Sequence, residues 1–462
     1  MQLLTLSSLG KTSAAGLMLI ATAIFASTAI DSWLLDLDWH NQQRAGQLIL
    51  LATAAAITMW RPLQTVGPLT FSLTITALLL GAYSSFRADY PVWAFKELSI
   101  YAGSLVTALL IGNAAKVPAI QSWLIRILLI SAATTAWMFA TYYSVALYIE
   151  IQNLDPYLLL YGFDNPRFLG QLQVLLLPIL LAKTAEMRDK KSAYWPLAFA
   201  LLIMHWCIAW SLGGRGMLAA VFVAHFLVIF IRQSYWRFFA GQAAVAALGL
   251  LLHVILFVAI PEWMGVEATT RSAIRSSLSG RETIWLIAWE MFTRNPIFGN
   301  GPLHYSAVWN HIAAHPHQLL LQWLAEWGAL ATIVLVTVSV RGILHGARFV
   351  QNEQSKLIDA AIWVGIISSF LLAQVDGMFV MPYPSTWLAI ICGLALARWT
   401  PELAHSSSQK YCFKIVGFTV FILIANTLVT ELPHLKKAEQ AFHERNEIGS
   451  PPRLWSQGWI PM

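Results

Sequence analysis

Apolar runs of about 20 residues recur along almost the whole chain, and they constrain the fold more than any other feature. A helix needs about 20 such residues to cross a bilayer, and inside lipid every backbone polar group must be paired within the spanning structure. Of the 462 residues, 58% are hydrophobic and 11% are charged, whereas soluble domains carry about 25% charged residues. The sequence therefore predicts an all-α polytopic membrane protein with about 12–13 transmembrane helices.

The candidate spans follow from a window of about 19 residues. They lie near 12–30, 43–60, 66–84, 98–114, 119–143, 168–182, 194–212, 216–231, 239–260, 318–340, 357–375, 384–398 and 411–430. The first run is interpreted as an uncleaved helix, because further spans follow at once. We expect one transmembrane domain at 1–430, including a long loop at about 261–317, and a polar C-terminal tail at 431–462.

Basic residues are unevenly distributed between the alternate loops, which predicts their sidedness. Cytoplasmic loops are enriched in Lys and Arg, so the richer set is predicted to face the cytoplasm. That set contains Lys11, Arg61, Lys116, Lys183, Arg188, Lys190, Lys191, Arg232, Arg237, Arg341, Arg348, Lys356, Arg398 and Lys410. The opposite loops are longer and would face the periplasm. An odd number of spans puts the tail on this outer side, and one span more or fewer reverses it.

The long loop at about 261–317 contains its own helix signal. Residues 281–293 place Ile284, Ile287, Ala288 and Met291 at helical spacing. Asn295-Pro296 ends that pattern, and Gly299 to Pro302 is typical of a turn. A short amphipathic helix across the external mouth is therefore expected.

Several arginines break the positive-inside trend by falling on the outer side. Arg167 and Arg215 each stand at the start of a span, and Arg281, with Arg271 and Arg275, lies in the long loop. An arginine at a membrane edge is costly unless it is paired or useful, and its planar fork suits phosphate oxygens. The alternative is that these side chains reach lipid headgroups or pair with Glu262, Glu267 and Glu282.

Four histidines crowd into one part of the same loop: His304, His311, His315 and His317. His317 follows Pro316 where strongly apolar sequence resumes, so it is predicted to stand at a helix start. The helix dipole disfavours an imidazolium there, and a neutral imidazole can accept a proton from a hydroxyl. Zinc is the alternative, but the spacing matches no common zinc motif and no cysteine is nearby. We predict no metal and no cofactor.

Other polar residues lie in or beside the spans. Gln318, Gln322 and Glu326 are four residues apart and would share one helix face, where they could position a substrate or tie helices together. Asp376 and Tyr383 fall in a short outer loop and could reach the same mouth. Candidate substrate-positioning residues are Gln318, Gln322, His315 and Tyr383.

Motifs for other chemistries are missing from the sequence. It contains no Walker loop, dinucleotide-binding glycine pattern, nucleophile elbow or paired-carboxylate motif. Neither ATP nor a nucleotide sugar is thus an evident substrate. The net charge of +6 is interpreted as topology information, because no basic stripe interleaved with aromatic residues lies outside the loops, and no nucleic-acid partner is predicted.

At these residues the chain resembles the bacterial O-antigen ligase superfamily, which includes O-antigen polymerases and O-linking oligosaccharyltransferases. Four stretches carry the resemblance: Asn165-Pro166-Arg167, Gly214-Arg215-Gly216, Arg281 through Gly301, and His317 through Gly328. The last is similar to the ligase signature of His, then Asn, Ser or Gln, then nine residues and Gly. The family pattern often ends in a small residue three positions later, which is Ala331 here. The order of the stretches and their common sidedness strengthen the resemblance.

The resemblance implies an inverting, metal-independent glycan transfer at the periplasmic face of the bacterial inner membrane. The donor would be an undecaprenyl-diphosphate-linked glycan. The essential histidine of the family corresponds to His317, and its arginines correspond to Arg215, Arg281 and, less closely, Arg167. The short sequences His-Pro-His-Gln and Ala-Glu-Trp-Gly resemble those of pilin O-oligosaccharyltransferases.

Several functions remain open at this point. A protein such as pilin is the first acceptor, lipid A-core is the second, and a growing O-antigen chain is the third. A transporter of lipid-linked glycans also fits many spans and external arginines, but it would need charged residues deep within several spans.

Overall fold

The computed structural model describes residues 6–30, 36–61, 63–149, 151–269, 280–401, 407–445 and 452–460. Arg271 and Arg275 lie outside these ranges. The described chain is almost entirely helical, and its two short strands, β1 (Asn153–Leu154) and β2 (Glu267–Ala268), form one parallel pair. The all-α class predicted from the sequence is confirmed.

Eight helical segments of the described chain are long and apolar enough to cross a membrane. They are α3 (Pro68–Arg87), α4 (Pro91–Ala114), α5 (Pro118–Tyr148), α6 (Pro166–Asp189), α7 (Trp195–Leu212), Gln233–Met264, α12 (Leu319–Gln351) and Ser407–Arg445. Gln233–Met264 contains η1 (Gln233–Tyr235), α9 (Trp236–Val254), η2 (Ile255–Ala259) and α10 (Ile260–Met264). Ser407–Arg445 contains α15 (Ser407–Glu431), η4 (Leu432–His434) and α16 (Leu435–Arg445).

Five further helices occupy the remaining predicted spans. Three are shorter apolar stretches: Ala14–Ser27 within α1 (Leu6–Ser27), α8 (Arg215–Ile231) and α13 (Leu357–Leu372). The other two are α2 (Trp39–Ile57) and α14 (Pro382–Trp399). Each predicted span thus corresponds to a helix, and the chain is a multi-pass membrane protein. Several helices begin earlier than predicted; α4, for example, starts at Pro91 because a proline suits the first helical turn.

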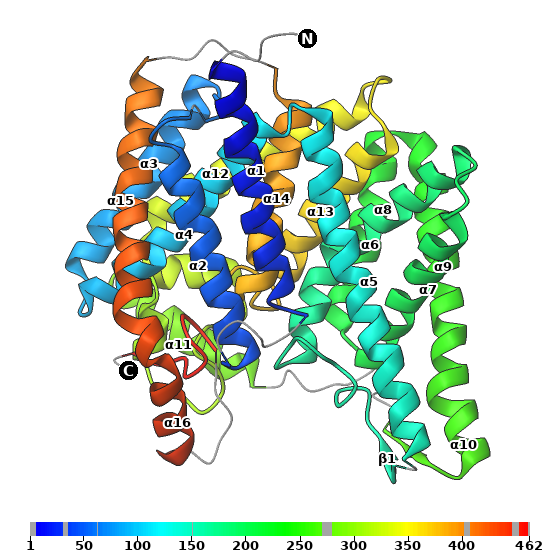
Figure 1. Cartoon of the computed structure of the whole chain (residues 1–462). Coiled ribbons are helices and arrows are strands. Elements are labelled where there is room, and N and C mark those ends of the chain that lie inside the picture. The colour runs from blue at the N-terminus through cyan, green and yellow to red at the C-terminus, as the bar shows by residue number, and fades with distance from the viewer. Residues whose placement is uncertain are drawn as a thin grey trace.

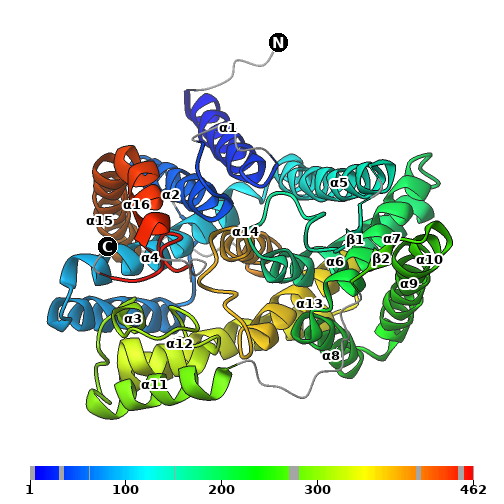
Figure 2. The ribbon, with the colours of Figure 1, turned by 90° about the horizontal axis from the view of Figure 1, so that it is seen from below.

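The helices stand side by side, and most are seen nearly end-on in Figure 2. α6 lies at the centre, with 83% of its apolar window buried, and it packs against α7, α13 and α14. The segment Gln233–Met264 lies at the edge, with 22% of its window buried. A helix that is apolar all round must be covered by protein or by lipid, so the exposed sides of the outer helices are suited to contact hydrocarbon.

The predicted amphipathic helix is confirmed as α11 (Arg281–Arg294). It buries Ile284, Ala288 and Met291 and lies beside α12 at one end of the molecule (Figures 1 and 2). The predicted turn follows it, with Gly299 and Gly301 at positive φ. A short helix, η3 (His304–Ala307), comes next.

The long helix α12 is broken at Gly328, whose φ of 75° and ψ of 174° are not helical. Two backbone N–H groups of the preceding turn enter the break, where Asn300 and Gly301 donate to the carbonyls of Ala325 and Glu326. In return, the Ala329 amide of α12 donates to the Pro296 carbonyl. A Cβ at Gly328 would lie 2.4 Å from the Ile297 carbonyl oxygen. The turn after α11 and the first part of α12 are therefore held as one unit, and only glycine fits between them.

The C-terminal segment 452–460 packs against the first turns of α2. Arg44 donates to the carbonyls of Arg453 and Leu454, and Asn41 exchanges hydrogen bonds with Ser456. The span predicted at 43–60 begins earlier in the structure, because α2 starts at Trp39 and buries both Asn41 and Arg44. The carbonyls of the C-terminal segment satisfy side chains that would otherwise be buried without partners.

Candidate active site

Four candidate residues stand at helix starts at one end of the bundle. Arg215 and Arg281 are the first residues of α8 and α11, Arg167 is the second residue of α6, and His317 lies two residues before α12. Helix N-termini carry partial positive charge and unpaired N–H groups, which attract anions. Asn165 caps α6 by accepting from the Arg167 amide. The arrangement favours a negatively charged ligand.

The linker between α13 and α14 joins these helix starts. The Arg281 guanidinium donates to the Val375 carbonyl at 2.9 Å, and Gln171 of α6 donates to the Asp376 carboxylate at 3.0 Å. A Cβ on Gly216, beside Arg215, would lie 3.0 Å from the Val375 side chain. One short linker therefore contacts the elements that carry all three arginines.

His317 contacts the same linker through its ring. Its Nδ1 lies 3.6 Å from Oδ1 of Asp376, and the side chain is 18% exposed. Nδ1 has no hydrogen-bond partner among the described residues, but the nearby carboxylate favours a proton on Nδ1, which leaves Nε2 to accept one. The accessible ring and its acidic neighbour make His317 the best-placed base of the cluster.

The Asp376 carboxylate is ionised in this setting. Burial alone would raise its pKa, but the neighbouring His317, the Gly377 amide and the charge of Arg167 together lower it. The Gly377 amide donates to Oδ1 at 2.7 Å. Asp376 thus provides a fixed negative charge beside the imidazole at any pH above the acidic range.

The backbone places His317 in an unusual conformation. Its φ is +52°, a region that residues other than glycine seldom occupy and that is often found at functional sites. The helix was predicted to begin at this residue but begins at Leu319, with Gln318 as the N-cap. This shift points the His317 ring toward the 373–377 linker instead of placing it on the first turn of α12.

His315 packs against the His317 ring and accepts a hydrogen bond from the His317 backbone. The two rings are 4.1 Å apart and inclined at 64°, and His315 Nδ1 accepts from the His317 amide at 3.4 Å. Burial, then the charges of His317 and Arg453, hold the pKa of His315 well below its usual value. His315 therefore stays neutral and able to accept this bond. A Cβ at Gly377 would lie 2.3 Å from its ring, so the linker packs tightly on it.

The three arginines make this end strongly electropositive. Arg167 and Arg215 are exposed, and Arg281 is half-buried. Partial burial and the charge of Arg167 lower the pKa of Arg281; Asp376 opposes this effect, and Arg215 adds to it. The charges of Arg167 and Arg215 thus both act on Arg281, and guanidinium groups suit the oxygens of a diphosphate.

The remaining predicted positioning residues lie in different surroundings. Gln318 accepts from the Leu321 amide and donates to Gln374, so it caps α12 at the edge of the cluster. Gln322 is buried and donates to Glu326. Tyr383 is fully buried in α14, where its hydroxyl bonds to Ser131 and to the Ala26 carbonyl. Gln322 and Tyr383 therefore belong to the packing of the helices.

The other histidines of the loop are separated. His304 accepts from the Tyr90 amide, and His311 is exposed beside Trp309. Among the residues that the structure describes, no three His, Cys, Asp or Glu side chains are grouped so that they could hold a metal ion.

Sequence reasoning missed the contribution of Arg453. This residue is 1% exposed, and its guanidinium binds both carboxylate oxygens of Glu326, at 2.8 and 2.9 Å, with Glu97 at 3.6 Å. It also donates to the Ala314 carbonyl just before the paired histidines. A glutamate such as Glu326 within an apolar helix indicates that a cation must be nearby, because burying an unpaired carboxylate is costly. Nothing in the sequence indicates which arginine pairs with it.

A comparison with protein families matches a segment that holds part of this cluster. Residues 197–336 match the family model described as O-antigen ligase. This segment is similar to O-antigen ligases. The match covers less than half of the chain and shows that this segment is similar to a family of glycosyltransferase-like ligases. A search of curated proteins found no match.

The matched segment includes most of α7, then α8, α11 and the first part of α12. Arg215, Arg281 and His317 fall within it, whereas Arg167 comes from α6 before it and Asp376 from the α13–α14 linker after it. The cluster is therefore completed by parts of the chain outside the matched segment.

Proposed function

We propose that the chain transfers a glycan from an undecaprenyl-diphosphate carrier to an acceptor hydroxyl, with inversion at the anomeric carbon. The observation that carries the proposal is the single linker on which His317, Arg281 and Gln171 converge. This convergence supports the proposal because the linker contacts both the candidate base and Arg281, a candidate diphosphate ligand. The O-antigen ligase match supports transfer chemistry on a glycan.

In this reaction His317 accepts the proton of the acceptor hydroxyl at Nε2. The oxygen attacks the anomeric carbon, a new glycosidic bond forms, and the bond from that carbon to the diphosphate oxygen breaks. Undecaprenyl diphosphate leaves with the bonding electrons. Asp376 stabilises the imidazolium that forms, because an ionised carboxylate favours the charged ring.

The arginines act on the leaving group. Arg215, Arg281 and Arg167 bind the diphosphate, and they stabilise the negative charge that develops on it as the bond breaks. Their exposed or half-buried positions suit a ligand that arrives from the membrane. We place this end at the periplasmic face of the bacterial inner membrane, where lipid-linked glycans are presented.

A protein such as pilin is our proposed acceptor, and the alternatives are lipid A-core and a growing O-antigen chain. The sequence from His315 to Gly328, which resembles that of pilin O-oligosaccharyltransferases, supports pilin as the acceptor. Pilin mass and lipopolysaccharide banding in a deletion strain separate these cases. A shift in pilin mass alone supports the proposal, loss of the whole O-antigen ladder supports a ligase, and loss of long chains alone supports a polymerase.

The direct test uses purified protein in detergent with donor lipid and each acceptor. Product formed without a sealed membrane would exclude pure transport of the glycan. His317→Ala is expected to lower the rate by at least about 10²-fold, the usual contribution of a general base. His311→Ala removes an exposed histidine of the same loop and is expected to remain active. Equal rates for both variants would exclude His317 as the base.

A further inference from the structure

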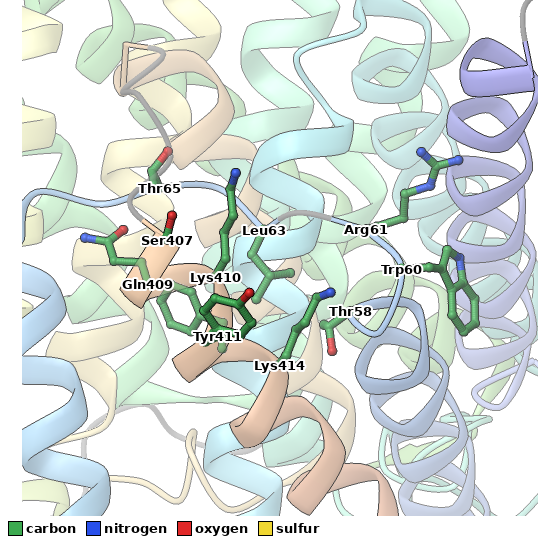
Figure 3. A pocket seen from close by; sticks show the side chains of 11 residues that line it. Thr58, Trp60, Arg61, Leu63, Thr65, Ser407, Gln409, Lys410, Tyr411 and Lys414 are labelled. Carbon is green, nitrogen blue, oxygen red and sulfur yellow. The ribbon is translucent and has the colours of Figure 1, made fainter.

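A second electropositive site lies at the opposite end of the molecule from His317. It is a cavity of about 440 Å³ between the loop that follows α2 and the first turns of α15. Figure 3 shows Arg61 and Trp60 on the loop and Lys410, Tyr411 and Lys414 on the helix. The first turn of α15 is at the top of Figure 1, whereas α11 is at the bottom.

The charges around this cavity are unbalanced. Its described lining includes Arg61, Lys410 and Lys414 and contains no Asp or Glu. α15 begins at Ser407, which also lines the cavity, so the positive end of that helix dipole is directed to the same place. Three cations and a helix N-terminus around one cavity favour binding of an anion. The planar guanidinium group of arginine and the ammonium group of lysine both suit phosphate oxygens.

Within the part of the chain that the structure describes, two polar atoms in the lining have no hydrogen-bond partner. The Nε of Arg61 and the Oε1 of Gln409 are buried without one, and Gln409 is only 7% exposed. Buried polar atoms without partners are uncommon in folded proteins. One is a donor suited to a phosphate oxygen, and the other is an acceptor suited to a hydroxyl. A phosphate diester that also carries hydroxyl groups would satisfy both.

The rim and floor of the cavity suit a lipid. Trp60 and Tyr411 are 59% and 70% exposed, and such aromatic side chains concentrate at the level of lipid headgroups. Leu63 and Phe413 form an apolar part of the lining. Basic residues that only set membrane topology do not need to line a common cavity. Lys190, Arg237 and Arg348, for example, are absent from this lining.

We propose that this cavity binds the phosphate of an anionic phospholipid headgroup, with phosphatidylglycerol as the fitting chemistry. Arg61, Lys410 and Lys414 contact the phosphate, and Gln409 accepts from a hydroxyl of the glycerol headgroup. The site lies in the leaflet opposite the candidate active site and uses none of its residues. This lipid-binding proposal can therefore be tested independently of the proposed transfer reaction.

The test measures lipid binding to the purified full chain by native mass spectrometry. The probes are dioleoylphosphatidylglycerol, dioleoylphosphatidylcholine and inorganic phosphate. The wild type is expected to prefer phosphatidylglycerol over phosphatidylcholine. R61Q/K410Q/K414Q is expected to lose about 100-fold in affinity, since each basic residue near a membrane surface contributes roughly a factor of five. K190Q/R237Q/R348Q makes the same change in net charge and is expected to retain binding.

Equal phosphatidylglycerol affinity in the two triple variants would overturn the proposal, as would equal binding of both lipids by the wild type. Displacement of the lipid by millimolar inorganic phosphate would show that the cavity binds free phosphate and not a lipid headgroup. Gln409→Leu is a second, neutral variant. It is expected to weaken phosphatidylglycerol but not phosphatidic acid, which lacks a headgroup hydroxyl, and equal weakening of both would remove the proposed hydroxyl contact.

Discussion

At the scale of single residues, the candidate site depends on a pair that lies 3.6 Å apart in space and far apart in the chain. His317 was predicted from its position at the edge of an apolar run, and Asp376 was predicted to reach the same mouth. Their direct pairing was not predictable, because the short linker that carries Asp376 is positioned by α13 and α14. Local sequence carries little information about such long-range packing.

Asp376→Asn tests this pairing. The amide keeps the shape of the side chain but removes its charge, so the imidazole loses the partner that orients it and stabilises its protonated form. Transfer is expected to fall roughly 10- to 100-fold, as for other residues that orient a functional imidazole. Initial rates with the purified variant would show this, and an unchanged rate would exclude an orienting role for Asp376.

Asp376 also predicts a pH dependence of stability. Its pKa is lowered in the folded state, so its ionised form stabilises the fold above the unfolded value of about 3.9. That contribution is lost as the pH falls through the lower, folded pKa. The difference in unfolding temperature between the wild type and D376N is therefore expected to be largest above about pH 5. Thermal unfolding across a pH series measures it, and a difference that grows on acidification would contradict the account.

At the scale of elements, the apolar runs predicted every helix that crosses the bundle, and the spacing around Ile284 predicted α11. The break in α12 was not predicted, because apolar sequence continues on both sides of Gly328. The glycine alone gave a weak signal. Its requirement follows from the turn at 296–301, which enters the break and bonds to carbonyls that a continuous helix would have paired.

Gly328→Ala tests the break. An L-residue at φ 75° is strained by about 1–3 kcal/mol, and the added Cβ would overlap the Ile297 carbonyl. The variant is expected to unfold at a lower temperature and to lose transfer, because the His317 loop and α11 are anchored there. Gly342→Ala is the matched control, since a Cβ at that position of the same helix meets nothing within 4 Å. Similar behaviour of the two variants would contradict this explanation.

The C-terminal segment forms a second structural unit that the sequence did not reveal. A polar tail was predicted at 431–462, and composition gives no reason to expect Arg453 to be buried. The structure places its guanidinium between Glu326 and Glu97, where it neutralises carboxylates that burial would otherwise destabilise. The same residue bonds to Ala314, so the tail and the histidine loop are mechanically connected.

Arg453→Met tests that connection. Breaking a buried ion pair by removing one partner costs about 3–5 kcal/mol, so unfolding in detergent is expected at a clearly lower temperature. The double variant E326Q/R453M is expected to recover part of this loss, because the unpaired charge is removed. Arg445→Met, at the exposed end of α16, is the control. No difference between Arg453→Met and the control would mean that the tail is not part of the folded unit.

At the scale of the whole molecule, the two ends of the bundle have different chemistry. One end gathers helix starts, three arginines and a histidine–aspartate pair, and the other end carries the basic cavity beside α15. The alternation of basic loops predicted two distinct faces. It could not predict which of the many basic residues share a cavity, because that depends on how α2 and α15 pack.

The most direct measurement is a structure of the full chain bound to a non-reactive analogue of the lipid-linked donor, determined by electron cryomicroscopy. The account predicts the diphosphate in hydrogen-bond contact with Arg215 and Arg281, and the anomeric carbon on the side of the His317 imidazole away from Asp376. A diphosphate bound at the opposite end, against Arg61 and Lys410, or a sugar remote from His317, would contradict it.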